Sequence, residues 1–172
     1  MKKISALFIA LCLLFCSCGA VPPGETVKNA LLLPATISVT CGNSAFSAYV
    51  HSEGFEVEYT APRALEGVEL RGGPAGVFVA ADGYSREVGE KVFPAAEGFV
   101  KAVRAISEAE KPDEESAGFC RYAIDEMQIM VYYDLDSGLI TNILTEDETA
   151  RTEYGVVSIV NDERTGHGDG RS

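Results

Sequence analysis

The sequence predicts a mainly β protein of the α+β class, in which an antiparallel curved sheet carries one central amphipathic helix on one face. Segments that alternate apolar and polar residues recur about every ten residues between turn residues, which favours antiparallel hairpins over βαβ units. A long helical period occurs once, from Pro94 to just before Lys111. Because the sheet offers the large apolar surface in such a chain, the apolar stripe of this helix is expected to pack on it.

The length and charge of the chain narrow the classes of function. The 172 residues suit one domain and can bury a real core. The formal net charge of −12 argues against nucleic-acid binding and against electrostatic docking on anionic lipid, since both need basic patches. With no Trp and two histidines, His51 and His167, the chain is not expected to form a His-based triad or a multi-His metal site.

Residues 1–17 are predicted to be a lipoprotein signal peptide. Two lysines precede an apolar stretch whose length suits a signal peptide and is too short for a comfortable membrane span. Its end, Phe15-Cys16-Ser17-Cys18-Gly19, resembles a bacterial lipobox, in which a cysteine is diacylated and becomes the new N-terminus. Cys18 is the expected acceptor because the small Ser17 precedes it, and its acyl chains would hold the protein on the extracytoplasmic face of the bacterial cell membrane. An ordinary secretory signal with incidental cysteines is the alternative.

The boundaries of the domain follow from composition. Residues 18–34 are expected to be a tether, because the run Val21-Pro22-Pro23-Gly24-Glu25 cannot propagate a helix or a central strand. Residues 26–33 could form a short helical turn or lead into the first strand. The folded domain is expected over residues 35–160, and the Gly-rich, polar residues 161–172 are expected to be a disordered tail.

Alternation with a period of two predicts six strands before the helix and four after it. They are expected near residues 37–41, 46–51, 55–60, 68–72, 77–81, 84–88, 119–125, 127–133, 139–145 and 151–160. Turn residues such as Asp82-Gly83 connect them as hairpins. Residues 111–116 are predicted to be an exposed polar loop after the helix.

The helix itself is predicted to begin at Pro94, a favourable residue for a first turn. Phe99, Val103 and Ile106 fall on its apolar face, and charged residues occupy the opposite face. Gly98 lies inside the helix and weakens it by about 1 kcal/mol relative to Ala. The missing side chain of Gly98 is expected to allow a close approach to the sheet.

The strands of the second half are apolar on both faces. In residues 127–133, for example, Ile129 and Val131 lie on one face, while Met130 and Tyr132 lie on the other. A sheet that packs on one side only alternates more cleanly. An ordinary two-sided core and an apolar pocket along one face would each account for the pattern.

Several short motifs follow the lipobox in a definite order. They are Gly54-Phe55-Glu56-Val57-Glu58-Tyr59-Thr60-Ala61-Pro62, Asp82-Gly83-Tyr84, Val92-Phe93-Pro94 and Tyr132-Tyr133-Asp134-Leu135-Asp136-Ser137-Gly138-Leu139-Ile140. This order, over about residues 35–160, resembles the LolA-like lipoproteins of Gram-positive bacteria. They are relatives of the outer-membrane lipoprotein carriers and of the mycobacterial lipid-binding lipoproteins. The resemblance implies a half-barrel of antiparallel strands with helix on its concave side, around an apolar cavity that holds acyl chains.

The resemblance therefore implies a membrane-anchored lipoprotein that binds a lipid or another apolar ligand. The residues expected to line the cavity are Phe46, Val57, Tyr59, Phe99, Val103, Ile106, Met130 and Tyr132. The alternative is a cell-surface protein-interaction or envelope-sensing scaffold with a filled core and no small ligand. Neither function is enzymatic, and no cofactor is expected.

No catalytic or metal constellation is predicted. Residues 134–138 resemble the start of a calcium loop but lack its later ligands, so a hairpin turn is expected there. His51 and Glu53 have no third ligand close in sequence, and a solvated strand face accounts for the neighbouring carboxylates Glu56 and Glu58.

Two cysteines lie inside the predicted domain, Cys41 and Cys120. Outside the cytoplasm they could pair and close a long loop, worth about 4 kcal/mol in the chain-entropy model. A disulfide needs their Cα atoms to lie close together, which the sequence does not show. A disulfide and two free thiols therefore both stay open at this point.

Overall fold

The structure is a computed structural model that describes residues 22–89 and 92–161. The elements in these ranges are α2 (Pro23–Ala30), β1 (Ala35–Cys41), β2 (Ser44–Val50), β3 (Phe55–Ala61), β4 (Glu69–Gly73), β5 (Gly76–Ala81), β6 (Tyr84–Val88), α3 (Pro94–Glu108), β7 (Glu114–Ser116), β8 (Phe119–Ile124), β9 (Met127–Tyr133), β10 (Ile140–Glu146) and β11 (Arg151–Asn161). The predicted signal peptide, Cys18 and residues 162–172 of the predicted tail lie outside the described residues.

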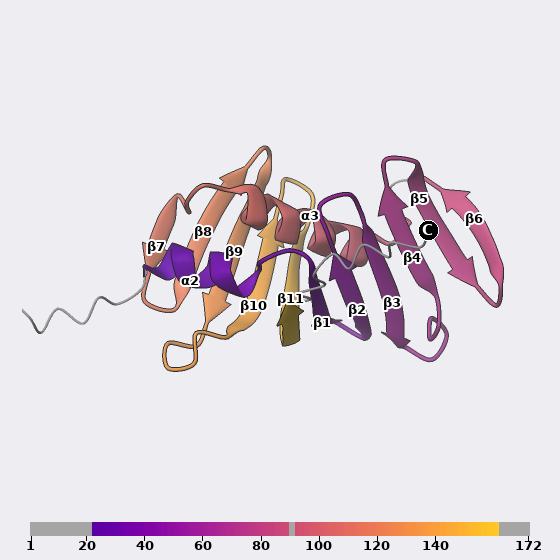
Figure 1. Ribbon diagram of the computed structural model, residues 1–172, viewed down its shortest axis with the longest axis horizontal. Coiled ribbons are helices and arrows are strands. Elements are labelled where there is room, and N and C mark those ends of the chain that lie inside the picture. Colours follow the sequence, from indigo (N-terminus) through magenta and orange to yellow (C-terminus); the bar gives the residue numbers. More distant parts are fainter. Residues whose placement is uncertain (1–21, 90–91, 162–172) are drawn as a thin grey trace, which may run out of the picture.

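The strands form a single antiparallel sheet in the order β6-β5-β4-β3-β2-β1-β11-β10-β9-β8-β7. The strands before α3 make one meander, the strands after it make another, and the pairing of β1 with β11 joins the two in the middle. The sheet curves without closing, and α3 crosses its concave side (Figure 1). The predicted fold class, a mainly β half-barrel with a helix on the concave face, is confirmed.

Helix α3 forms as the sequence predicts. It begins at Pro94, and the carboxylate of Glu97 accepts a hydrogen bond of 2.9 Å from the backbone N–H of Phe93, which caps the first turn. A Cβ atom added to Gly98 would lie 3.0 Å from the hydroxyl of Tyr154 on β11. The expected close approach of the helix to the sheet at this glycine is confirmed.

The expected tether contains a docked helix instead. In α2, Val27 is fully buried, as is Leu31 just after the helix, and the helix packs beside β7 and β8 (Figure 1). The N–H of Gly24 donates to Glu115 at 3.0 Å, which ties the start of α2 to β7. The helical turn left open for residues 26–33 forms as part of α2. The prediction that residues 21–25 cannot propagate a helix was wrong, because proline is well tolerated in the first turn of a helix, where its missing N–H would have no partner within the helix.

Residues 114–116 were predicted to belong to an exposed loop, but they form strand β7. This strand is short and exposed, and it forms by pairing its backbone with β8.

The buried apolar side chains of the described residues all lie between Val27 and Tyr154. Residues 18–172 therefore contain this complete hydrophobic core. In the described ranges, none of the helices has the length and hydropathy needed to span a membrane.

Candidate functional site

The residues predicted to line a cavity under α3 form a packed cluster. Phe46, Val57, Tyr59, Phe99, Val103 and Ile106 come together between α3 and the sheet, and none is more than 3% exposed. The ring of Phe99 lies 5.8 Å from that of Phe46 and 5.2 Å from that of Tyr154. These side chains fill the middle of the half-barrel, so the expected cavity does not lie at this place.

Met130 and Tyr132 do not belong to this cluster. Their neighbours Ile129 and Val131 are fully buried on the concave face, and successive side chains of a strand point to opposite faces. Met130 and Tyr132 therefore lie on the convex face, where Tyr132 is 39% exposed. The prediction placed them on the wrong face because β9 is apolar on both faces, which removes the signal that sets the register.

The structure has an open groove at another place on the concave side. It has a volume of about 640 Å³ and lies beside α3, between the β2–β3 loop and the β4–β5 turn. Its lining residues are Ser52, Glu53, Phe55, Gly73, Pro74, Val77 and Arg104. None of these residues was predicted from the sequence to bind a ligand.

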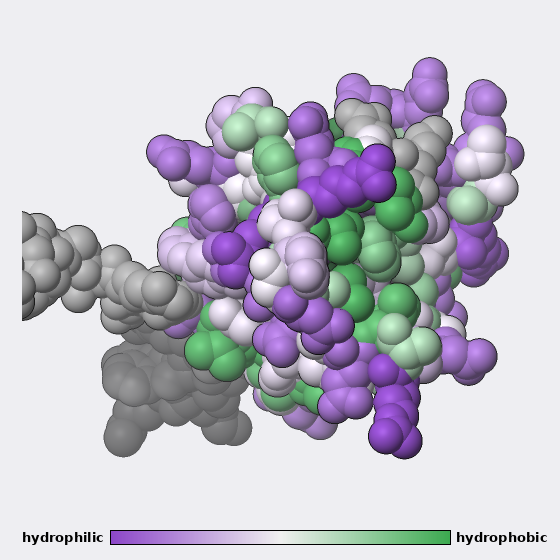
Figure 2. Space-filling model, turned by 90° about the vertical axis from the view of Figure 1, so that its right-hand side faces the viewer, coloured by the Kyte–Doolittle hydropathy of each residue, from purple (hydrophilic) through white to green (hydrophobic). Residues whose placement is uncertain are grey.

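The floor of the groove is apolar because of the register of β3, β4 and β5, and the apolar row continues onto β6. Phe55 on β3 pairs with Gly72 on β4, Gly72 pairs with Val77 on β5, and Val77 pairs with Val88 on β6. The Phe55 ring occupies the space in which a side chain of Gly72 would lie. Phe55, Val77 and Val88 are only partly buried. Seen from the β6 side, the molecule carries a band of hydrophobic surface between hydrophilic rims (Figure 2).

Arg104 brings a positive charge to the rim of this groove. Its Nη2 atom donates a hydrogen bond of 3.1 Å to the backbone carbonyl of His51, which ties α3 to the β2–β3 loop. Its Nε atom is buried and has no hydrogen-bond partner. His51 itself accepts a hydrogen bond through Nδ1 from the N–H of Glu53 at 3.3 Å, so these two residues stabilise a turn. Among the described residues, no group of three or more His, Cys, Asp or Glu side chains could hold a metal ion.

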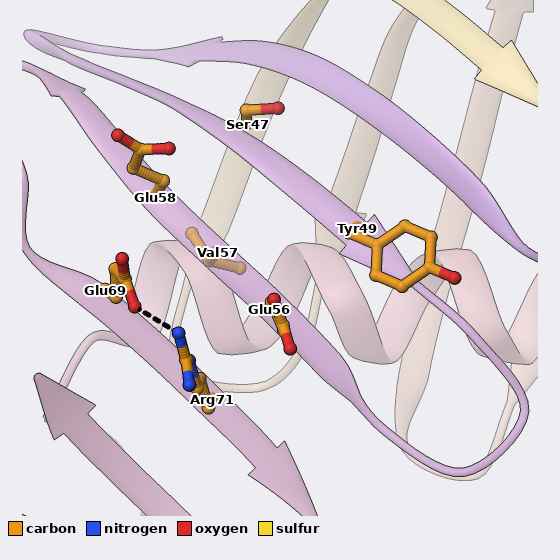
Figure 3. Close-up of a pocket in the computed structure, with 7 residues that line it drawn as sticks. All are labelled: Ser47, Tyr49, Glu56, Val57, Glu58, Glu69 and Arg71. Carbon is orange, nitrogen blue, oxygen red and sulfur yellow. Dashed lines mark hydrogen bonds and ion pairs between the residues drawn. The ribbon is translucent and has the colours of Figure 1, made fainter. Parts of the chain in front are cut away.

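A second hollow, of about 140 Å³, lies on the convex face and is polar (Figure 3). Glu56, Glu58 and Glu69 lie around it, and Arg71 forms an ion pair of 2.6 Å with Glu69. Both side chains of this pair are well exposed, at 57% and 42%. Glu56 and Glu58 are exposed on a solvated strand face, as the sequence predicts.

The predicted hairpin turn after β9 is confirmed. The N–H and hydroxyl of Ser137 both donate to one carboxylate oxygen of Asp134, at 2.8 and 2.7 Å. These bonds hold the pKa of the Asp134 carboxyl below its usual range. The carboxylate therefore stabilises the turn that connects β9 to β10.

Cys41 and Cys120 are both free thiols in the structure. They lie on β1 and β8, and β11, β10 and β9 separate these strands in the sheet. At a spacing of about 4.8 Å per strand, this is about 19 Å along the sheet, whereas a disulfide needs Cα atoms within about 7 Å. Of the two possibilities left open by the sequence, the structure therefore has two free thiols at Cys41 and Cys120 and no disulfide between them. Burial raises the pKa of the Cys120 thiol to about 11 and also raises that of Cys41.

Comparisons with known proteins give similar structures but no match in sequence. No protein-family model matches the chain, and a search of curated proteins gives no match. A LolA superfamily protein from Nitrosomonas europaea is 10% identical with a TM-score of 0.38, covering 85% of this chain and 96% of the other. LprF from Mycobacterium bovis is 10% identical with a TM-score of 0.36, covering 81% and 95%. A DUF1329 family protein from Desulfovibrio piger is 9% identical with a TM-score of 0.35, covering 83% and 93%.

In each of these pairs about one residue in ten is identical. What those proteins bind therefore cannot be inferred for this chain. The properties of the groove follow from its own residues. A LolA superfamily protein, the kind of protein that the sequence motifs resemble, is thus among the solved structures to which this chain is similar.

Proposed function

We propose that the protein is a lipoprotein, held by Cys18 on the extracytoplasmic face of the membrane, that binds a lipid or another apolar ligand in the groove beside α3. The observation that carries the proposal is the pair of partly exposed apolar side chains Phe55 and Val77 in the groove, which α3 leaves accessible and which Val88 continues on β6. Burying such surface contributes about 25 cal/mol per Å² of apolar area. An acyl chain is a ligand that can bury it.

The dimensions of the groove support a small ligand. Sites for small molecules usually measure roughly 300–1,000 Å³ and are lined by apolar groups with a few polar ones. The groove, at about 640 Å³, has Phe55, Pro74 and Val77 as apolar lining and Arg104 as a charged group. It is open along its length, so a bound chain would keep part of its surface in solvent.

The short distance to the proposed anchor supports access to membrane lipid. The chain from Cys18 to the first described residue, Pro22, is four residues long. Even when fully extended, four residues span at most about 14 Å. The domain would therefore stay next to the bilayer from which a lipid ligand could be taken.

The alternative is a protein-interaction or envelope-sensing scaffold without a small ligand. The packed cluster around Phe99 favours it, because the middle of the half-barrel contains no space for a ligand. Both functions are proposed as non-enzymatic. The two differ in whether the groove takes up an apolar molecule.

A binding titration tests the proposal directly. The soluble chain, residues 18–172 with Cys18→Ser, would be titrated with a neutral fluorescent apolar dye. We expect saturable binding, and Val77→Asp should weaken it at least about tenfold, because it places a charge on the apolar floor. Val160→Asp is the matched control, since Val160 is 60% exposed on the convex face opposite Thr36. Absence of saturable binding, or equal loss in both variants, would contradict the groove as the site.

The proposed anchor needs a separate test in cells. Cys18→Ala in the full chain should move the protein from the membrane fraction to the soluble fraction, because a single residue carries the acyl chains. A variant that stays with the membranes after a high-salt wash would show that the lipobox interpretation is wrong.

A further inference from the structure

We infer that the groove selects amphiphiles with an anionic head group, and that the guanidinium of Arg104 binds this head group. The inference rests on the proposed function and adds to it the chemical class of the ligand. A carboxylate or a phosphate at the end of an acyl chain has the required chemistry.

Arg104 has hydrogen-bond donors that the described residues do not use. A guanidinium has five N–H donors in a rigid fork and is always charged. One donor of Arg104 is bound to the carbonyl of His51, and the buried Nε donor has no partner. Since a buried unpaired donor is costly, an acceptor that pairs with it would remove that cost.

Among the described residues, no carboxylate forms an ion pair with the guanidinium of Arg104. The chain carries 26 acidic residues against 14 lysines and arginines. The ion pairs formed among the described residues nevertheless involve Arg71 with Glu69 and Arg121 with Glu114, and neither includes Arg104. In so acidic a protein, a partly buried arginine without an acidic partner is available to an anion from outside.

The charge of Arg104 lies beside the apolar floor of the groove. Arg104 lines the same groove as Phe55 and Val77, so one ligand can contact all three side chains. The bond to the carbonyl of His51 holds the guanidinium at the rim formed by the β2–β3 loop. From that loop Ser52 adds a hydroxyl, and Glu53 adds the acidic group that lines the groove. An apolar floor with a fixed cation at its rim fits an acyl chain that ends in an anionic head group.

The experiment compares two ligands that share a chain and differ in the head group. Laurate and dodecanol would each displace the neutral apolar dye from the soluble chain, and inorganic phosphate would serve as a head group without a chain. We expect the wild type to bind laurate at least about tenfold more tightly than dodecanol, a difference of about 1.4 kcal/mol. Phosphate alone should not displace the dye at comparable concentration.

The variants assign the preference to one residue. Arg104→Met should abolish the preference, so that the two ligands bind with equal affinity, and Arg104→Lys should keep part of the preference because it keeps the charge. Arg63→Met is the matched control, since Arg63 is exposed and lies outside the groove. Unfolding in urea shows whether each variant is folded, and the head-group preference of the wild type tests the inference even if Arg104→Met does not fold.

The outcomes separate this inference from the proposed function. If the wild type binds both ligands with equal affinity, or if Arg104→Met keeps the preference for laurate, the role of Arg104 is refuted while apolar binding stands. If phosphate alone binds as tightly as laurate, the site is a simple anion site and the inference is wrong. If neither ligand displaces the dye and the dye itself does not saturate, the proposed function fails together with the inference.

Discussion

Substitution of Phe99 tests whether the middle of the half-barrel is filled. The Phe99 side chain is fully buried, and its ring packs between those of Phe46 and Tyr154 at 5.8 and 5.2 Å. Replacing a buried phenylalanine by alanine costs about 3–5 kcal/mol, from lost transfer energy and from the void that remains. Because small domains are stable by only about 5–15 kcal/mol, Phe99→Ala should lose a large part of the total stability.

The assay is equilibrium unfolding of the soluble chain in urea, followed by far-UV circular dichroism. Tyrosine fluorescence provides a second probe, since the chain has no tryptophan. Leu139→Ala is the control, because Leu139 is 66% exposed and should change the free energy of unfolding by less than about 0.5 kcal/mol. Equal slopes of the two unfolding curves would show that the variants unfold in the same way.

Ligand affinity completes this test. Phe99 does not line the groove. In the absence of urea, where the variant is folded, Phe99→Ala should therefore leave the affinity for the dye unchanged. A loss of stability below about 1.5 kcal/mol, together with an altered affinity, would refute the packing described for this cluster. That result would instead favour a ligand cavity beneath α3.

Three further outcomes follow from the structure. Leu31→Ala should cost about 2–5 kcal/mol, as for a core residue, whereas a free tether would show no loss in the same urea assay. Thiol titration without reductant should find both Cys41 and Cys120 in the denatured chain and little reaction in the native one; a denatured chain with no free thiol would contradict the free pair. Burial raises the pKa of Tyr59 and of Tyr154 to about 12. Unfolded phenols lose their protons near pH 10, so stability should be fully present below pH 10 and fall toward pH 12. A urea midpoint that stays constant from pH 9 to 12 would contradict this burial.

The sequence predicted the elements whose signals are local. The Asp82-Gly83 turn is one example, because both residues adopt positive φ angles, 50° and 82°, which few other residue pairs tolerate. The start of α3 at Pro94 is another. Strand β7 has no comparable signal, since residues 114–116 are polar and exposed and become a strand only through pairing with β8.

The candidate site was harder to predict, because it depends on what lies across the sheet. The groove exists where Gly72 has no side chain and the Phe55 ring takes its place, a relation between two strands that no local period contains. Arg104 falls on the polar face of α3, so its position at a groove appears only once the β2–β3 loop is in place. The assignment of Met130 to the cavity failed for another reason: both faces of β9 are apolar, so the sequence does not show which face of this strand is buried.

Native mass spectrometry of the protein extracted from its own membranes tests the central claim most directly. We expect a species that carries a noncovalently bound amphiphile in addition to its covalent acyl chains. This added mass should disappear in Val77→Asp and persist in the convex-face control Val160→Asp. Wild-type protein that carries only the mass of its acylated chain, under conditions that preserve noncovalent lipid complexes, would contradict the assignment of the groove as a binding site.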